Sequence, residues 1–466
     1  MGQGGHINLI NGSPYDWTST GSHQYQMSGW EWPDTVRSGS SVQAYVEWDQ
    51  DPGVHDEDDA GEAYYSITGS PDKFSVHANN RDGFEIVVNL DNFETKNNPR
   101  GSTIDVGFEW GFTRNFILSG SAGDYSSSNP PVDWMHQNLE TLGDRKLRHI
   151  CMPGSHDSGM SVLGTKTTGA SERNTITQVL NIYDQLKAGA RFFDIRPVIS
   201  NGLFYTGHYS EIEGFWQGGN GQSIDEVIDQ INRFTSEYKE LVVLDLSHAY
   251  NTDNGATSYT DFTQDEWNRL FMQMKAINGR LVDAVAGNED LTQWTLNNFI
   301  GNGDGAVLIF AEMAGGASVD PFKEEGFFSP NNFPVFNQYA NTHDVDRMRS
   351  DQVSKLKSNR DIVPGGKDGF FLLSWTLTME DVGDILNPAV SILGFSSKCY
   401  YPLFEVFNSF RPQSFPNVIY VDGFGVQLPG NYLFDDFHGN PRPSTDITAL
   451  AMAVNGIAGK NTYITG

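Results

Sequence analysis

The strongest constraint on the fold is a change of hydrophobic periodicity near residue 128. Before that point, short runs alternate apolar and polar side chains, and clusters of Gly, Asn, Asp and Pro separate the runs. The expected strands cover residues 42–48, 63–67, 84–90, 104–110 and 115–118. Short strands at regular spacing with turn residues between them are typical of sandwich folds. Residues 1–128 are therefore predicted to form an all-β sandwich of the jelly-roll type.

From residue 129 onward, apolar strands alternate with segments of helical periodicity. Eight strands are expected, at residues 149–153, 190–196, 203–208, 241–247, 306–312, 335–340, 370–376 and 418–423. This alternation predicts an α/β domain over residues 129–466, a (β/α)₈ barrel of the TIM type. An open doubly wound sheet is the alternative. The loop after the first strand, Pro153-Gly154-Ser155-His156, lacks the glycine fingerprint of a Rossmann unit.

The charge balance excludes one class of partner. The chain has 30 Lys and Arg against 59 Asp and Glu, a net charge of −29. Such a chain is repelled by phosphate backbones, so general nucleic-acid binding is not expected. The sequence has no apolar run of membrane-spanning length and no visible signal peptide. We therefore expect a soluble protein, cytoplasmic or secreted, that contacts membranes transiently.

Polar side chains gather at the ends of five expected strands. Barrel enzymes carry their functional side chains at the carboxyl ends of the strands. The residues at these ends are His156 and Asp157, Asp194 and Arg196, His208, Asp245 and His248, and Asp422. One histidine can accept a proton, a second can donate one, and an arginine can hold phosphate oxygens. A lone His or Asp at a strand end is usually a cap, but five such ends favour a phosphoryl-transfer site.

Five of these segments, in this order, resemble a known family. The motifs GSHDS, FFDIRP, GH, VVLDLSH and VIYVDGF lie between residues 148 and 424. Together they resemble the X domain of phosphatidylinositol-specific phospholipase C, of the bacterial type and of fungal phospholipase C-like phosphodiesterases. The resemblance implies a barrel fold and a phosphorus–oxygen lyase or phosphoric diester hydrolase. Its implied substrate is a phosphoinositide or a glycosylphosphatidylinositol (GPI)-type lipid.

The resemblance also implies roles for the two histidines. His156 matches the general base that deprotonates the inositol 2-hydroxyl, which attacks phosphorus to give a cyclic phosphate. His208 matches the general acid that protonates the diacylglycerol oxygen. Asp422 matches the aspartate that orients His156.

Arg196, Asp194 and Asp157 bear on the question of a metal. By resemblance, Arg196 clamps the phosphate, the two aspartates shape the site, and Asp157 assists His208. Calcium-dependent relatives carry Glu-Leu-Asp where this chain has Asp194-Ile195-Arg196. A guanidinium cannot ligate a cation. No metal and no cofactor are therefore expected.

The sequence indicates the residues that contact the head group less clearly than the catalytic residues. The basic residue that bacterial enzymes carry on the fourth strand has no counterpart among Asp245, Ser247 and His248. We expect Asp245, His248, Glu312 and Trp375 to contact substrate, with packing an equal alternative for Trp375. A different head group, or a catalytically silent lipid-binding protein, remains the rival interpretation.

Two further expectations concern membranes. Phe215 and Trp216 follow His208 in a glycine-rich segment and could enter a lipid interface, although core packing is equally expected. The first domain carries no recognisable catalytic set and is interpreted as a lipid- or carbohydrate-binding module, with a purely structural role as the alternative. Expected partners are thus a phospholipid substrate and a membrane surface.

Overall fold

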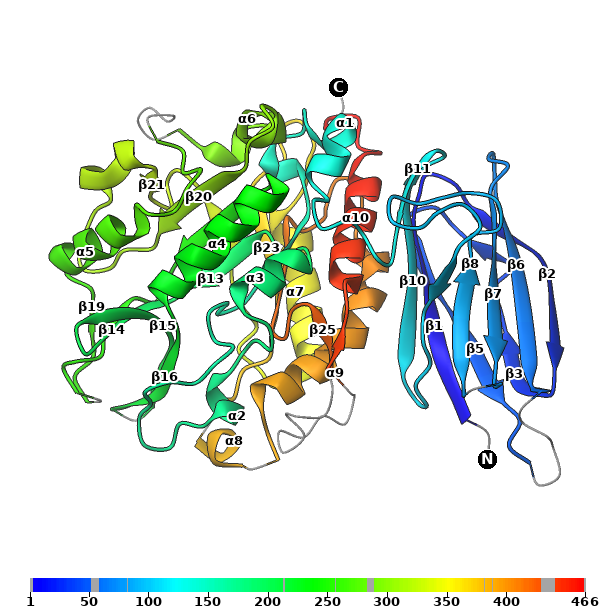
Figure 1. Cartoon of the computed structure of the whole chain (residues 1–466), viewed down its shortest axis with the longest axis horizontal. Helices are drawn as coiled ribbons and strands as arrows, with labels where there is room; N and C mark the ends of the chain where they lie inside the picture. Colours follow the sequence, from blue (N-terminus) through cyan, green and yellow to red (C-terminus); the bar gives the residue numbers. More distant parts are fainter. Residues whose placement is uncertain are drawn as a thin grey trace. The chain divides into compact units, whose positions relative to one another are not determined.

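The computed structural model describes residues 3–51, 58–81, 83–212, 214–255, 257–282, 289–380, 382–387, 389–428 and 441–464. The chain divides into two compact units. The first contains Met1–Pro131, Tyr401–Phe415 and Thr445–Gly466, and the second contains Val132–Tyr400 and Pro416–Ser444. Figure 1 shows long strands in the first unit and mixed strands and helices in the second. Among the helices in these ranges, none is long and apolar enough to cross a bilayer.

The first unit is built from two β-sheets. Its strands are β1 (Gln3–Gly12), β2 (Trp17–Tyr25), β3 (Met27–Glu31), β4 (Thr35–Val36), β5 (Ser40–Trp48), β6 (Ala60–Ile67), β7 (Lys73–Asn79), β8 (Glu85–Asn89), β9 (Thr103–Asp105), β10 (Thr113–Ser121) and β11 (Asp124–Ser127). One sheet has the order β11-β10-β1-β5-β3, and the other has the order β4-β2-β6-β7-β8-β9. All pairings are antiparallel except that of β1 with β10.

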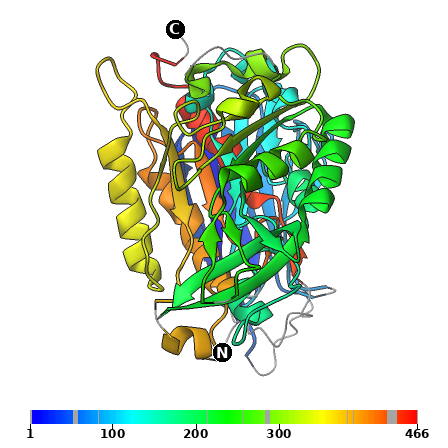
Figure 2. The same cartoon turned by 90° about the vertical axis from the view of Figure 1, so that its left-hand side faces the viewer.

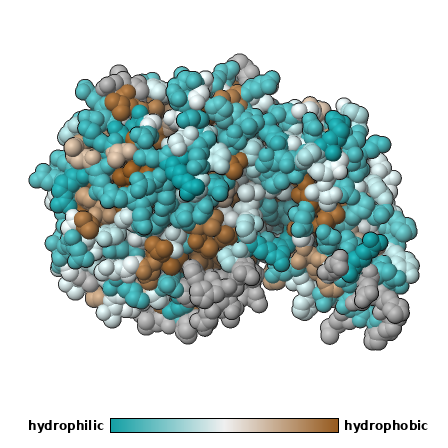
Figure 3. Space-filling view, in the orientation of Figure 1, coloured by the Kyte–Doolittle hydropathy of each residue, from teal (hydrophilic) through white to brown (hydrophobic). Residues whose placement is uncertain are grey.

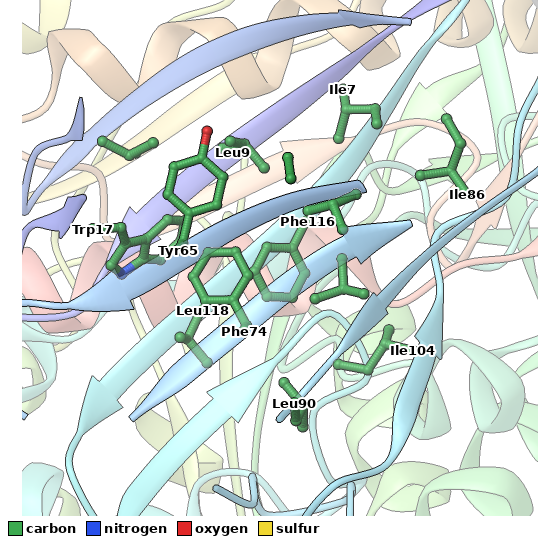
Figure 4. Packing of buried hydrophobic residues seen from close by; sticks show 14 of the residues in the cluster. Ile7, Leu9, Trp17, Tyr65, Phe74, Ile86, Leu90, Ile104, Phe116 and Leu118 are labelled. Atoms are coloured by element: carbon green, nitrogen blue, oxygen red, sulfur yellow. The ribbon is translucent and has the colours of Figure 1, made fainter. Parts of the chain in front are cut away.

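One hydrophobic core joins the inner faces of the two sheets (Figure 4). The Phe116 ring on β10 lies 5.2 Å from the Phe74 ring on β7 and 5.9 Å from the Trp17 ring on β2, between centroids. Four expected strands overlap β5, β6, β8 and β10. The expected strand over residues 104–110 is wrong beyond Asp105, because Gly107 and Gly111 have φ of 72° and 75°, values that interrupt a strand.

Helix α10 (Asp446–Ala458) also packs in the first unit. Nearly all of its side chains are buried, as expected for a helix that is apolar around most of its circumference. Close approach to the sheet depends on glycine, since a Cβ on Gly12 would lie 2.5 Å from the Ala453 backbone. The sequence places this helix with residues 129–466. The domain boundary at residue 128 stays a prediction.

The second unit contains a curled, all-parallel sheet of eight strands with the order β21-β20-β17-β13-β12-β24-β23-β22. These strands are β12 (Met152–Ser155), β13 (Phe192–Ile195), β17 (Leu241–Leu246), β20 (Ala306–Ala311), β21 (Phe327–Phe328), β22 (Val335–Asn337), β23 (Phe370–Trp375) and β24 (Val418–Val421). The fold is of the predicted barrel type. Within the described ranges, however, no pairing joins β21 to β22, so the sheet is not closed there.

Nine helices accompany the strands along this part of the chain within the described residues. They are α1 (Leu139–Leu142), α2 (Glu172–Thr175), α3 (Ile182–Lys187), α4 (Ile224–Tyr238), α5 (Gln264–Met274), α6 (Leu296–Ile300), α7 (Val345–Asn359), α8 (Val382–Leu386) and α9 (Ile392–Glu405). Figure 2 shows α7 (yellow) on one side of the sheet and α4 and α5 (green) on the other. Both α4 and α5 begin with a capping box, at Ser223 and Thr263.

One predicted barrel strand belongs elsewhere. Residues 203–208 lie in β15 (Leu203–Ile212), which pairs antiparallel with β14 (Pro197–Ser200) and β16 (Phe215–Ser223). With β18 (Tyr250–Asn251) and β19 (Thr260–Asp261) they form a separate five-stranded sheet. The short strand β21 is the eighth member of the parallel sheet instead. A hairpin and a barrel strand share the same alternation of side chains, so periodicity could not separate them. A further short pair joins β25 (Val426–Gln427) to β26 (Arg442–Pro443).

A buried ion pair stabilises the amino-terminal side of the parallel sheet. Arg191 and Glu240 precede β13 and β17, and both side chains are fully buried, with Nη2 and Oε2 2.7 Å apart. Backbone groups satisfy the remaining polar atoms, since Glu240 accepts from the N–H groups of Met135 and His136. Removing one partner of such a pair leaves an uncompensated charge in the core.

We therefore expect Arg191→Met to destabilise the protein by about 3–5 kcal/mol in urea unfolding. The double variant Arg191→Met/Glu240→Leu should recover most of that loss, because it removes both buried charges. Equal stability of Arg191→Met and the unmodified protein would contradict this account of the ion pair.

Candidate functional site

The register of four adjacent strands brings the site residues together. In the pairs β17–β13–β12–β24, Asp245 lies beside Asp194, Gly154 beside Phe192, and Gly154 beside Tyr420. Side chains alternate along a strand, so residues two apart share a face. The face of Asp194 therefore also carries Asp245, His156, Tyr420 and Asp422 at the carboxyl ends of their strands.

Asp194 is the centre of the hydrogen-bond network. Its Oδ2 accepts from Arg196 Nε at 3.0 Å and from Tyr420 Oη at 2.6 Å. It also accepts from the backbone N–H of Asp157 at 3.0 Å, while Oδ1 accepts from Ser247 Oγ at 2.6 Å. Burial raises the pKa of this carboxyl, but Arg196 and the nearby histidines outweigh burial, and the pKa lies below its usual value. The surrounding charges therefore favour the ionised form of Asp194.

His156 lies between Asp422 and Arg196. Its Nδ1 is 2.6 Å from Asp422 Oδ1, and Arg196 Nη2 donates to its Nε2 at 2.8 Å. Arg196 can donate only to an unprotonated Nε2, so this geometry belongs to a neutral ring with its proton on Nδ1. Burial lowers the pKa of His156, but the Asp422 carboxylate more than compensates, and the net shift is upward.

Asp157 is buried in an unusual backbone conformation. Its φ is 39°, in the left-handed region, and Thr177 Oγ1 donates to its carbonyl at 2.8 Å. Neither carboxyl oxygen has a hydrogen-bond partner within the described residues, and Arg196 Nη1 lies 3.6 Å away. Burial and the neighbouring Asp194 raise the pKa of Asp157 to about 7 despite Arg196. A strained residue with an unsatisfied acid is typical of a functional position.

His208 enters the site from the hairpin strand β15. Its Nδ1 donates to the carbonyl of Thr175 at 3.0 Å, which leaves Nε2 as the reactive nitrogen. Burial, Arg196 and His156 lower the pKa of His208 to about 3. The expected support of His208 by Asp157 has no counterpart in these contacts, in which a backbone carbonyl holds the ring.

Two residues after β17 extend the network. His248 has a φ of 48°, and its Nδ1 lies 2.8 Å from Ser247 Oγ, which itself donates to Asp194. Arg196 and burial lower the pKa of His248 to about 4, so the ring is neutral at pH 7. His248 therefore orients Ser247 toward Asp194.

Trp375 is a correction to the predicted substrate contacts. It pairs in register with Val421, on the face opposite Tyr420 and Asp422. The side chain is 2% exposed, and its indole N–H donates to the carbonyl of Cys399 at 2.9 Å. Trp375 therefore has neither exposed ring surface nor a free indole N–H to contact a substrate, and we interpret it as a packing residue.

Of the two aromatic residues that follow His208, Phe215 is exposed and Trp216 packs against other rings. Phe215 begins β16 and is 38% exposed, and Leu203 at the start of β15 is 60% exposed. The Trp216 ring lies 4.7 Å from Tyr250 and 5.6 Å from Tyr259, between centroids. Figure 3 shows a largely hydrophilic surface with separate apolar patches on the face in view. Membrane contact by Phe215 and Trp216 stays a prediction.

The sequence analysis missed three residues of the hydrogen-bond network at the site. Tyr420 could have been found, since it lies two residues before Asp422 and must share its face. Ser247 could have been found in the same way, since it lies two residues after Asp245. No sequence pattern could have indicated Thr175, because it acts through its backbone carbonyl.

Comparison with known proteins agrees with the motifs. No family model matches the chain. A PI-PLC X-box domain-containing protein of Dictyostelium discoideum is 30% identical over 156 residues, which is 30% of this chain and 18% of that protein. PI-PLC X domain-containing protein 3 of Bos taurus is 26% identical over 287 residues, 56% of this chain and 78% of that protein. The predicted resemblance to PI-PLC X domains is confirmed.

A bacterial enzyme also matches part of this chain. The 1-phosphatidylinositol phosphodiesterase of Staphylococcus aureus is 26% identical over 250 residues, 51% of this chain and 75% of that protein. A crystal structure of the phosphatidylinositol-specific phospholipase C of that organism covers 71% of this chain at 16% identity, with a TM-score of 0.47. The likeness to fungal relatives stays a prediction.

The charge on Asp422 raises the pKa of His156. Replacing Asp422 by Asn removes the carboxylate that raises the pKa of His156, so we expect a lower pKa, measured from the ring C–H shifts in an NMR titration. Asp384→Asn is the matched control, since Asp384 supports the exposed His343 at 2.9 Å and should leave His156 unchanged. An unchanged His156 titration in Asp422→Asn would refute this assignment.

Proposed function

We propose that the chain is a phospholipase C-like phosphodiesterase that cleaves a phosphoinositide or GPI-type lipid without a metal ion. The observation that carries the proposal is the His156–Asp422 pair facing Arg196, with a second histidine, His208, held by Thr175. The names of the relatives support the class of substrate. The products are a cyclic inositol phosphate and diacylglycerol.

In the first half of the proposed step, His156 is the general base. Nε2 accepts the proton of the inositol 2-hydroxyl as the oxygen forms a bond to phosphorus. Asp422 holds the Nδ1 proton and stabilises the imidazolium that forms. The substrate must first displace the Arg196 N–H from Nε2, which frees the guanidinium to bind the phosphate oxygens.

In the second half, His208 is the general acid. The bond between phosphorus and the diacylglycerol oxygen breaks, and that oxygen takes a proton from Nε2. The low pKa of His208 means that the free site holds this ring neutral. An anionic phosphodiester beside Nε2 raises the pKa of His208 by charge attraction, so substrate binding would favour protonation of this ring. The pKa directions alone favour the reverse roles, whereas the contacts of His156 with Asp422 and Arg196 favour His156 as the base.

Arg196 supports a metal-free reaction. Its guanidinium lies 2.9 Å from Asp194 and 3.6 Å from Asp157, the carboxylates that would otherwise ligate a cation. A fixed positive charge there stabilises the charge that grows on the phosphate oxygens. A catalytically silent lipid-binding protein is the second candidate, and the absence of turnover would favour it.

Replacing either histidine by alanine should slow the release of cyclic phosphate by about 10²–10⁴-fold, the range for a lost general acid or base. A substrate with an acidic leaving group, such as a nitrophenyl phosphodiester, separates the roles. It should restore much of the rate of His208→Ala but not of His156→Ala, because that leaving group needs no proton. His343→Ala, at an exposed position, is the control. Rescue of His156→Ala alone would reverse the assignment.

Activity should survive an excess of EDTA. Arg196→Lys should lose at least about tenfold, since a point charge cannot form the bidentate contacts of the guanidinium. Loss of activity in EDTA that calcium or magnesium restores would replace this mechanism by a metal-dependent one.

A further inference from the structure

The orientation of His208 depends on a single turn of helix. Its Nδ1 donates to the carbonyl of Thr175 at 3.0 Å, and Thr175 is the last residue of α2. A helix leaves its last carbonyls without partners in its own backbone, so this carbonyl is available to the ring. One helical turn is not stable in water by itself. The position of the Thr175 carbonyl therefore depends on contacts that α2 makes with other segments.

Asn174 connects α2 to the strand beside His208. Its Oδ1 accepts a hydrogen bond from Gln217 Nε2 at 2.9 Å, and both side chains are buried. Gln217 lies on β16, the strand on which Gly219 pairs with His208. The imidazole ring and the carbonyl that it contacts are therefore fixed to the same hairpin.

The Asn174 amide also fixes the beginning of α2. Its Oδ1 accepts from the backbone N–H of Ser171 at 2.8 Å, as part of a capping box. Its Nδ2 donates to the carbonyl of Gly169 at 3.1 Å and to that of Ile385 at 3.4 Å. The acceptor and both donors of this amide are thus used within the protein. One buried side chain joins α2 to the segment before it, to β16 and to α8.

Arg173 anchors α2 to the end of α8. Its Nη2 donates to the carbonyl of Ile385 at 3.1 Å, and its Nη1 donates to that of Val390 at 2.6 Å. Nη1 also contacts the carbonyl of Asn387. The planar guanidinium holds several acceptors in a fixed geometry, whereas a lysine ammonium lies on a flexible stem. Figure 1 shows α2 and α8 side by side, near β16.

A general acid needs this kind of support. The nitrogen that gives up the proton must lie within about 2.6–3.2 Å of the leaving oxygen. A hydrogen bond from Nδ1 to a fixed carbonyl selects the tautomer and the ring orientation that direct Nε2 to that place. A shift of about 1 Å in a reacting group can cost about 100-fold in rate. Residues that hold the Thr175 carbonyl therefore act on the rate without touching the substrate.

We propose that Arg173 and Asn174 are positioning residues for the general acid, which hold the Thr175 carbonyl where it directs His208 Nε2 toward the leaving oxygen. The inference rests on the proposed function only in naming His208 as the general acid. The contacts from Asn174 to β16 and from Arg173 to α8 carry it, because they are the links that fix a one-turn helix against the ring.

The first experiment observes the ring without catalysis. The full chain is labelled with ¹⁵N-histidine, and the signal that is missing from His208→Ala identifies the ring. We expect the unmodified protein to show one neutral tautomer, protonated at Nδ1, and Arg173→Ala and Asn174→Ala to show a mixture of both. Gln217→Leu removes one donor with little change of volume, and it tests the same link if an alanine variant does not fold. A single tautomer that persists in the folded variants would overturn the proposal.

The second experiment compares two leaving groups. Arg173→Ala and Asn174→Ala should each lower kcat on phosphatidylinositol by about 10–100-fold with little change in KM. They should leave the rate on a nitrophenyl inositol phosphodiester nearly unchanged, because that leaving group needs no proton. Arg173→Lys should lie between, since it keeps donors but loses the planar geometry. Equal losses on both substrates would show general damage to the site and overturn the proposal.

A matched control comes from a second capping box. Asn298 has the same place in α6 that Asn174 has in α2, where it accepts from the backbone N–H of Thr295 at 2.8 Å. Asn298→Ala should change neither the His208 tautomer nor the ratio of the two rates. A change of the same size in this variant would reduce the effect to lost stability and contradict the proposal.

The two experiments separate this inference from the proposed function. A change of tautomer in the variants of a protein that cleaves neither substrate rejects the proposed function and retains the positioning of His208. Cleavage of phosphatidylinositol with an unchanged tautomer and unchanged rates in both alanine variants rejects the positioning alone.

Discussion

The carboxylate of Asp194 holds together four adjacent strands of the parallel sheet. It lies on β13 and accepts hydrogen bonds from Arg196, from the backbone of Asp157 after β12, from Tyr420 on β24 and from Ser247 after β17. Charge-assisted hydrogen bonds of this kind are short and strong in a site of low dielectric constant. The position of Arg196, and through it that of His156, therefore depends on one buried anion.

The same network makes the two histidines chemically unequal. His156 has a carboxylate on Nδ1, and His208 has a neutral carbonyl in the corresponding place. The shared guanidinium lowers the proton affinity of both rings, but only His156 has a compensating anion. Two identical side chains thus acquire opposite pKa shifts from their partners. A substrate that brings its own negative charge would change this balance most at His208.

Charge at the site also differs from charge over the whole chain. The net charge of −29 would repel an anionic lipid surface as a whole. The exposed side chains of β15 and β16 include the apolar Leu203 and Phe215 and also the polar Ser210 and Glu211. Membrane contact by Phe215 and Trp216 stays a prediction.

The hydrophobic periodicity of the sequence predicted the barrel-type fold of the second part and the strands of the first, but it did not place helix α10 in the first unit. The strand ends and the family resemblance together pointed to His156, Arg196, Asp194 and Asp422. The motifs lie at strand ends, and strand ends of a parallel sheet meet at one edge, so local patterns carried that information. The pairing of β15 did not follow from its own residues, because a hairpin strand and a barrel strand share one pattern of alternation.

Other features were decided only by tertiary contacts. The sequence left Trp375 open between substrate contact and packing, and the register with Val421 and the hydrogen bond to the Cys399 carbonyl favour packing. The Thr175 carbonyl reached His208 across 33 residues, which no pattern of side chains could signal. The sequence by itself predicted the histidines, the arginine and the aspartates at the strand ends, since residue type and strand period are local. Only the tertiary structure decided which nitrogen is free, which acid lacks a partner and which ring is buried, because those depend on neighbours brought from distant parts of the chain.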